Sequence, residues 1–345
     1  MLYVVLFFLV VSLLLYVLLA GADFGAGMVE LFSSKKSQEL TKKTVYRVIG
    51  PVWEANHIWI IIIVVILWVG FPDFYNVMTV YLHIPITLVL LGITMRGVAF
   101  VFRHYDAYKD QSQILYDWMF RIGSLITPIF LGMTFGAFIS GKLILTENYE
   151  NYSFYELFVA PWLNTFSIFV GLFFAALCGF LATVLLIGEA TRQEEVKFFV
   201  KEAVIANSIV VFLGFCVLSI GYFNNITFVT EFITNPYVMV LMAISAILII
   251  PLIQTIKNEN RIWSRFYVGL QVVLILLAAM IPHFPNLLIA SNTKVSILDT
   301  VSDDSVINVL GISLIVGGAI ILPGLFYLLK SFKMIKILEE SNKNQ

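Results

Sequence analysis

The sequence predicts an all-α fold: a polytopic transmembrane helix bundle of about nine helices, forming a single integral membrane domain over residues 1–345. Hydrophobic residues make up 60% of the chain and charged residues 12%, which excludes an ordinary soluble domain. Apolar runs of about 20 residues recur along the chain, and each is long enough to cross a hydrocarbon core of about 30 Å. The formal net charge of −1 argues against a nucleic-acid partner.

The apolar runs define the expected helices. Their approximate bounds are 2–30, 48–71, 76–102, 119–141, 157–187, 203–222, 237–256, 263–283 and 305–330. The first, third and fifth runs exceed what the hydrocarbon core requires, so we expect tilted helices or interfacial ends there. The first run has no basic region before it and no small-residue cleavage site, so we interpret it as a retained helix and not a signal peptide.

The distribution of lysine and arginine predicts the orientation. Of the 21 Lys and Arg residues, only Lys142 and Lys294 fall in loops on the side of the N-terminus, and only Arg96 lies deep within a predicted helix. The others fall in or beside the opposite loops and in the C-terminal tail. Because cytoplasmic loops are enriched in basic residues, we expect the N-terminus outside, the C-terminus inside and a multi-pass protein of the bacterial cell membrane.

The stretch that opens the second helix carries the most informative polar residues, Gly50-Pro51-Val52-Trp53-Glu54-Ala55-Asn56-His57-Ile58-Trp59. Glu54 and His57 lie one helical turn apart at the inner end of that helix. Asp23 lies toward the inner end of the first helix and Arg96 toward the inner end of the third. Consecutive helices joined by short connections are usually neighbours, so we expect the four side chains at a similar level.

Two interpretations of these four residues are compatible with each other. In the first, Arg96 pairs with Asp23 or Glu54 and neutralises a buried polar corner, as buried charges generally require a partner. In the second, Glu54, His57 and Asp23 form a proton path from the inner side, because intramembrane Asp, Glu and His are the groups that proton relays use.

The residues predict no metal or cofactor site of the chain's own. With four histidines and two cysteines, the chain has few side chains that could bind a metal ion or a haem. His83 and His283 share the outer half of the membrane, but hydrogen bonding within the protein is the more common role of such histidines. Cys178 and Cys216 lie in apolar segments and are expected to be free thiols.

Residues 21–28 (GADFGAGM) and 50–59 (GPVWEANHIW) together resemble subunit II of the cytochrome bd-type quinol oxidases. The first matches the motif that ends the family's first helix, and the second matches the more specific motif that opens its second helix. Residues 95–100, 122–136 and 290–309 are also similar, so the resemblance covers nearly the whole chain. The sequence departs from many members in having Glu54 where they have Asp, Ala22 where they have Phe, and Leu298 where some relatives have Trp.

The resemblance implies a complex that reduces oxygen to water with electrons from quinol. It places haems b and d, and the quinol-oxidising loop, in a partner subunit I, and implies that this chain is part of the enzyme without carrying its redox centres. It assigns the proton path from the cytoplasm to the acidic residue of the second-helix motif, here Glu54, with His57 and Asp23 nearby and Arg96 as charge partner. A structural quinone in this chain and a small accessory subunit are both compatible with the resemblance.

Two other functions remain open on the sequence alone. A secondary transporter with an ion site on the inner side would need broken helices near the bilayer midplane and an internal inverted repeat, and the sequence displays neither. A purely structural scaffold subunit would need no titratable function of Glu54 or His57.

Overall fold

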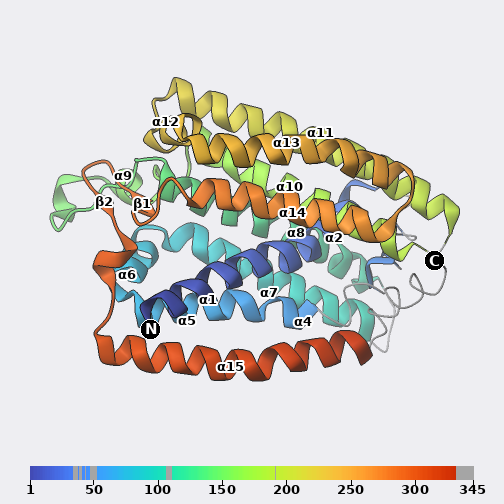
Figure 1. Ribbon diagram of the computed structural model, residues 1–345, viewed down its shortest axis with the longest axis horizontal. Coiled ribbons are helices and arrows are strands. Elements are labelled where there is room, and N and C mark those ends of the chain that lie inside the picture. Colours follow the sequence, from blue (N-terminus) through green and yellow to red (C-terminus); the bar gives the residue numbers. More distant parts are fainter. Residues whose placement is uncertain are drawn as a thin grey trace.

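The computed structural model describes residues 1–33, 38, 41–42, 44–46, 53–105, 111–190 and 192–331. Within these ranges, eight helices are long and apolar enough to cross a membrane, and a bent helix pair can make a ninth span. The long helices run along one common axis (Figure 1). The eight spans are α1–η1–α2 (Leu2–Leu15, Tyr16–Ala20, Gly21–Phe32), α7 (His83–Tyr105), α8 (Ser112–Ile139), α10 (Thr165–Glu189), α11 (Gln193–Phe223), α13 (Pro236–Lys257), α14 (Arg261–Met280) and α15 (Asp304–Ser331).

The remaining span is built from shorter pieces. Helix α4 (Trp53–Asn56) leads through a helical turn at His57 into α5 (Ile58–Gly70). Helix α6 (Pro72–Tyr81) then turns away from α5 by 115°. The bend lies at Phe71, whose backbone is not helical, and Pro72 begins the new helix, a position where the missing N–H of proline has no consequence.

The expected helix 76–102 is divided between α6 and α7, with the break at Leu82. Pro85 explains the break, because its ring nitrogen has no hydrogen to donate to the carbonyl of Tyr81 four residues earlier. Three other helices differ from their expected bounds. Helix α8 begins at Ser112 instead of near residue 119. Helix α10 begins at Thr165, after the short helix α9 (Phe154–Phe158), and α11 begins at Gln193 instead of near residue 203.

The short elements gather at the end of the bundle where α1 begins (Figure 1). They are α6, η2 (Tyr149–Asn151), α9, α12 (Thr227–Thr234), β1 (Leu288–Ile289), β2 (Lys294–Val295) and η3 (Ile297–Thr300). Strands β1 and β2 pair antiparallel, with Leu288 opposite Val295. The backbone N–H and the hydroxyl of Ser302 donate to the carbonyls of Gly70 and Val69, at 2.9 and 2.6 Å. These bonds fasten the segment before α15 to the end of α5.

Close packing of α2, α8 and α10 forms the centre of the bundle. A Cβ at Gly25 would lie 1.9 Å from the carbonyl oxygen of Cys178 on α10, and a Cβ at Gly27 would lie 2.1 Å from the Ser124 hydroxyl on α8. Glycine at these two positions therefore lets the neighbouring helices approach the backbone of α2 directly.

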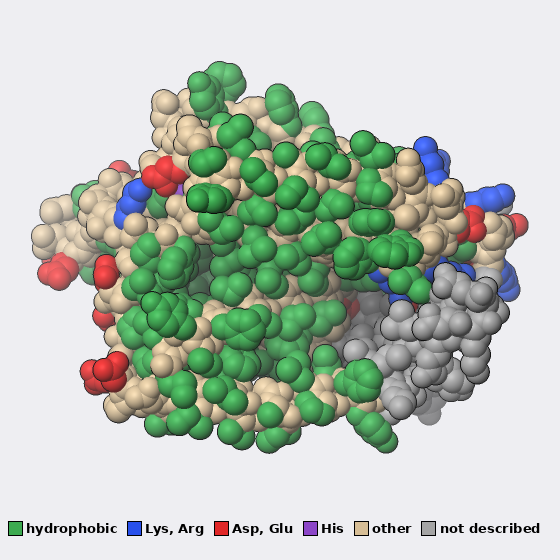
Figure 2. All heavy atoms as spheres, in the orientation of Figure 1, with side chains coloured by type: hydrophobic (Ala, Val, Ile, Leu, Met, Phe, Trp, Pro, Cys, Tyr) green, Lys and Arg blue, Asp and Glu red, His purple; other side chains and the backbone are tan. Residues whose placement is uncertain are grey.

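The surface is divided along the long axis (Figure 2). Hydrophobic side chains cover the middle of the molecule, Lys and Arg gather at the end away from the start of α1, and acidic side chains are prominent at the other end. Helix α1 begins and α15 ends at opposite ends of the bundle (Figure 1). This arrangement suits a protein that spans a membrane with a basic and an acidic side.

Candidate functional site

A buried ion pair joins α2 to α7. Arg96 donates from Nη1 to Asp23 Oδ2 at 2.9 Å, and from Nη2 to Asp23 Oδ1 at 2.6 Å and to the Asp23 carbonyl at 3.1 Å. Its Nε donates to the Ser124 hydroxyl on α8 at 3.0 Å. Both side chains are 2% exposed or less. The bidentate geometry satisfies both carboxylate oxygens, which is the arrangement that stabilises a buried charge pair best.

Aromatic rings enclose this pair. The Arg96 guanidinium carbon lies 5.3 Å from the centroid of Phe24 and 5.0 Å from that of Phe120. Ring faces attract a cation and exclude water from its surroundings. The small residues of the first motif make this possible, since Gly27 leaves space for the side chains of Ser124 and Phe120 on α8.

A second charged cluster lies one to two turns nearer the basic end. Glu30 Oε1 on α2 accepts from Arg103 Nη2 on α7 and from Arg121 Nε on α8, the latter at 2.9 Å. Asp117 Oδ1 lies 2.7 Å from Arg103 Nε and 2.6 Å from Lys42 Nζ. Glu30 Oε2 is buried and has no hydrogen-bond partner among the described residues. Two layers of ion pairs thus hold α2, α7 and α8 together.

His57 lies beside the Asp23–Arg96 pair. Its ring centroid is 5.7 Å from that of Phe24, the residue next to Asp23, and 6.3 Å from that of Tyr16. Asp23 and Arg96 are both within electrostatic reach of the imidazole. The structure therefore brings Asp23, Arg96 and His57 together, from the first three spans of the chain.

Several buried polar atoms near His57 lack partners. Within the described ranges no hydrogen-bond partner is present for His57 Nδ1, Tyr16 Oη, Trp59 Nε1 or Ser12 Oγ. Tyr16 and Trp59 belong to one buried cluster with Ala20 and Phe24. Ser12 precedes Tyr16 by one helical turn, which places its hydroxyl about 6 Å further along α1. Buried polar atoms nearly always have a partner, so the described residues leave the hydrogen-bonding capacity of these four atoms unused.

The position of Glu54 is described only for its backbone. Glu54 belongs to α4, which packs against η1 (Tyr16–Ala20). The side chain of Glu54 lies outside the described residues, as do the side chain of His104 and residues 50–52 of the second motif.

Sequence reasoning left out several members of the site. Tyr16 and Ser12 are ordinary residues of an apolar helix, and no motif distinguishes them. Trp59 ends the second motif and Ser124 lies in the similar stretch 122–136, but neither was predicted as a site residue. The sequence did contain an indication of the second cluster, because charged residues at the inner ends of three spans require partners. These residues are Glu30, Arg103 and Arg121. Their reciprocal pairing depends on the rotation of each helix, which the sequence does not specify.

The described histidines contact different parts of the chain. His57 lies at the start of α5. His83 is exposed, with Nδ1 2.8 Å from the Val80 carbonyl. His283 stacks on Phe228, with ring centroids 4.0 Å apart, and its Nδ1 lies 3.3 Å from Glu231 Oε2. Within the described residues there is also no group of three or more His, Cys, Asp or Glu side chains arranged for a metal ion.

Comparison with known proteins identifies the family. The family model described as "Cytochrome bd terminal oxidase subunit II" matches residues 1–332. The chain belongs to the cytochrome bd subunit II family. Eight membrane-spanning helices and this membership make it a multi-pass bacterial membrane protein.

Three relatives of this subunit II are bacterial proteins. The cytochrome bd ubiquinol oxidase subunit 2 of Bacillus subtilis is 32% identical over 50% of this chain and 49% of its own length. The match therefore spans about half of that relative. A putative cytochrome bd menaquinol oxidase subunit II of the same organism is 23% identical over 92% of this chain and 91% of its length. The cytochrome bd-I ubiquinol oxidase subunit 2 of Escherichia coli K12 is 26% identical over 37% of this chain and 33% of its own length.

The fold is shared with a solved structure, that of the bd oxidase from Geobacillus thermodenitrificans. The TM-score is 0.73 with 17% identity, covering 96% of this chain and 98% of the other. Asp23 and His57 lie in the two recognisable motifs of this subunit II, and Arg96 reaches Asp23 from α7.

Proposed function

We propose that this subunit II is the membrane partner of a haem-bearing subunit I in a bd-type quinol:oxygen oxidoreductase. Its role is to take up protons from the cytoplasmic side for the reduction of oxygen to water. The names of its relatives, which are ubiquinol and menaquinol oxidase subunits, support the substrate class. The basic end of the bundle supports the cytoplasmic assignment of the end near His57, because basic residues mark that side.

The observation that carries this proposal is the row of unpartnered polar atoms beside a buried ion pair. His57 Nδ1, Tyr16 Oη and Ser12 Oγ are all buried without partners among the described residues. They begin next to Asp23 and continue along α1 into the bundle. A structural polar corner would be expected to satisfy these atoms, since each unpaired buried group destabilises the fold.

In the proposed path, Glu54 takes a proton from the aqueous phase at the basic end and passes it to His57, directly or through water. Both oxygens of Asp23 are held by Arg96, so Asp23 acts by keeping a negative charge beside the imidazole. Hydroxyl groups both donate and accept, so Tyr16 and Ser12 can pass the proton on without carrying a net charge. In the assembled enzyme, haems b and d of subunit I supply the oxygen chemistry.

The test is the Glu54→Gln variant, which keeps the size of the side chain and removes its proton. The complex is reconstituted in vesicles, and quinol-driven oxygen consumption and membrane potential are measured together. We expect both to fall by about a hundredfold or more, the range typical for loss of a proton-transfer group. Glu194→Gln is the matched control, because Glu194 is an exposed acid in the first turn of α11 at the same end.

Haem content, read from the optical spectrum, separates failed assembly from failed proton uptake. A Glu54→Gln complex with full haem, normal turnover and normal potential would contradict the proposed path and leave the chain with the role of a structural scaffold.

A further inference from the structure

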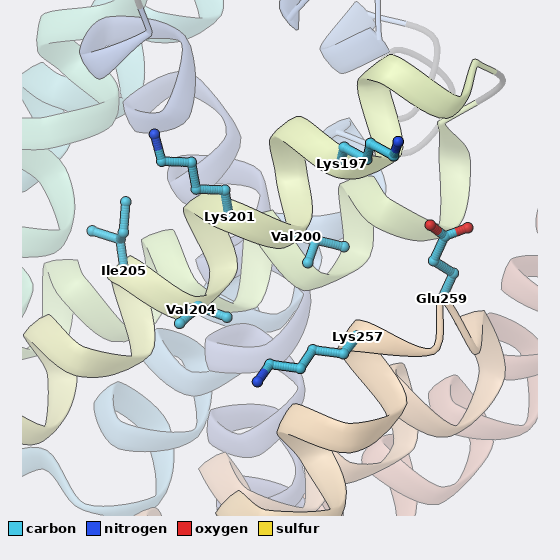
Figure 3. Close-up of a pocket in the computed structure, with 7 residues that line it drawn as sticks. All are labelled: Lys197, Val200, Lys201, Val204, Ile205, Lys257 and Glu259. Carbon is cyan, nitrogen blue, oxygen red and sulfur yellow. The ribbon is translucent and has the colours of Figure 1, made fainter.

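An open pocket of about 490 Å³ lies at the basic end of the bundle, between α11 and the end of α13. Figure 3 shows its lining, which combines three lysines, three aliphatic side chains and one carboxylate. The lining residues are Lys197, Val200, Lys201, Val204, Ile205, Lys257 and Glu259.

The spacing of residues along α11 places one set of side chains on the same wall of this pocket. Lys197 and Lys201 are four residues apart, and so are Val200 and Val204. Residues separated by three and four positions share one face of a helix. A single face of α11 therefore presents ammonium groups beside aliphatic side chains, and Lys257 in the last turn of α13 adds a third ammonium from the facing helix.

The charges of the lining residues favour an anionic ligand. Within the described part of the chain, none of the three lysines forms a salt bridge, and all three residues are exposed. The one carboxylate, Glu259, accepts from the side-chain amide of Gln193 at 2.7 Å, through Oε1. The charges lining the pocket therefore sum to a net positive value.

The depth of the pocket matches the headgroup layer of a bilayer. Helix α11 has 31 residues, about 46 Å at 1.5 Å per residue, which exceeds a hydrocarbon core of about 30 Å. Its uncharged, mainly apolar part begins near Ala203. Lys201 and Lys197 therefore lie about 3 and 9 Å outside the apolar part, where headgroup phosphates lie.

The apolar wall continues into the membrane. Beyond Val204 and Ile205, the same face of α11 carries Ile209 and Phe212, which are exposed hydrophobic side chains. A soluble phosphate ion would use only the lysines, whereas a phospholipid would place its phosphate between them and its acyl chains along this face.

We propose that this pocket binds the headgroup of an anionic phospholipid. Juxtamembrane lysines attract anionic lipids at about 1 kcal/mol each, which corresponds to about fivefold in affinity per lysine. The site lies away from the Asp23–Arg96 pair and is independent of the proton path.

The experiment is native mass spectrometry of the intact complex in mild detergent, titrated with phosphatidylglycerol or phosphatidylcholine. We expect the wild type to retain phosphatidylglycerol in preference to phosphatidylcholine. The triple variant Lys197→Gln, Lys201→Gln, Lys257→Gln is expected to lose about a hundredfold of that affinity. Val204→Trp, which keeps every charge and fills the apolar wall, should also reduce retention.

The control is Arg192→Gln, which removes an exposed charge at the start of α11 outside the pocket and should leave retention unchanged. Glycerophosphoglycerol, the headgroup without acyl chains, is added in large excess to separate the two sources of phosphate. Equal retention of phosphatidylcholine, equal loss in Arg192→Gln, or free headgroup that binds as tightly as phosphatidylglycerol would each overturn the proposal.

Discussion

Arg96 donates to both carboxylate oxygens of Asp23 and to its backbone carbonyl, so the two residues form one neutral unit inside the bundle. Removing either partner leaves the other charge buried and uncompensated. We expect Asp23→Leu and Arg96→Met each to destabilise the complex by about 3–5 kcal/mol. Thermal unfolding of the purified complex, followed by its optical spectrum, measures the loss.

The double variant Asp23→Leu, Arg96→Met separates two causes of destabilisation: a buried charge left without its partner, and the loss of the ion-pair contact itself. Because neither charge is then left unpaired, we expect it to be more stable than either single variant. Additive losses in the double variant would contradict this explanation. Its proton uptake is expected to stay low, because the negative charge beside His57 is gone.

The close approach of α2 and α10 depends on Gly25. In Gly25→Ala the new methyl group would lie 1.9 Å from the carbonyl oxygen of Cys178 and 2.7 Å from the Cβ of Ala182. A backbone carbonyl cannot move aside without displacing its helix, so we expect this variant to lose most of the assembled complex. Gly179→Ala is the matched control, because its nearest neighbour would be the terminal methyl of Met28 at 3.9 Å. Haem-bearing complex recovered per unit of membrane protein is the measurement, and equal recovery from both variants would refute the packing argument.

Hydropathy predicted the membrane-crossing parts of this fold well and its helix ends poorly. Apolar runs report the residues in contact with lipid, but a helix also includes the polar turns that extend beyond the bilayer. Helix α11 therefore begins at Gln193, although its apolar run begins near residue 203. The break at Leu82 follows from Pro85, a local steric signal that an averaged hydropathy does not register.

The level of the site residues was predictable, but their partners were not. Alternating helices predicted a similar level for Asp23, His57 and Arg96, and the structure brings these three residues together. Whether Arg96 would face Asp23 or Glu54 depends on helix rotation. Ser124 and Tyr16 enter through the packing of apolar helices, which carries no motif.

Tyr16 offers a specific test of the route beyond His57. Tyr16→Phe keeps the ring contacts with Phe24 and His57, at 6.5 and 6.3 Å, and removes only the unpartnered hydroxyl. We expect normal haem content with turnover and charge separation reduced together, by about tenfold or more. Tyr3→Phe is the control, because Tyr3 lies on α1 but is 85% exposed. Unchanged proton uptake in Tyr16→Phe would remove this hydroxyl from the route.

His283 predicts a dependence on pH at the opposite end of the molecule. Burial against Phe228 lowers the pKa of His283 below its ordinary value of 6.5, and Lys294 lowers it further, while Glu231 opposes the shift. While the loop is closed, the His283 imidazole stays neutral. If the loop opened, the imidazole would take up a proton at the ordinary histidine pKa. Stability of the contact between α12 and the β1–β2 loop should thus be complete above about pH 6.5 and decline as the pH falls from there toward the lowered pKa.

Hydrogen–deuterium exchange of residues 288–297, compared between about pH 7.5 and about pH 5.5 so as to bracket the ordinary histidine pKa, measures this opening. His283→Gln cannot titrate and corrects for the intrinsic change of exchange rate with pH. We expect the wild-type loop to lose protection at the lower pH relative to this variant. Lys294 and Glu231 also face this contact, with Lys294 Nζ 3.0 Å from Glu231 Oε1. A wild-type loop that kept its protection, or lost it equally in His283→Gln, would show that burial of the neutral imidazole does not control this contact.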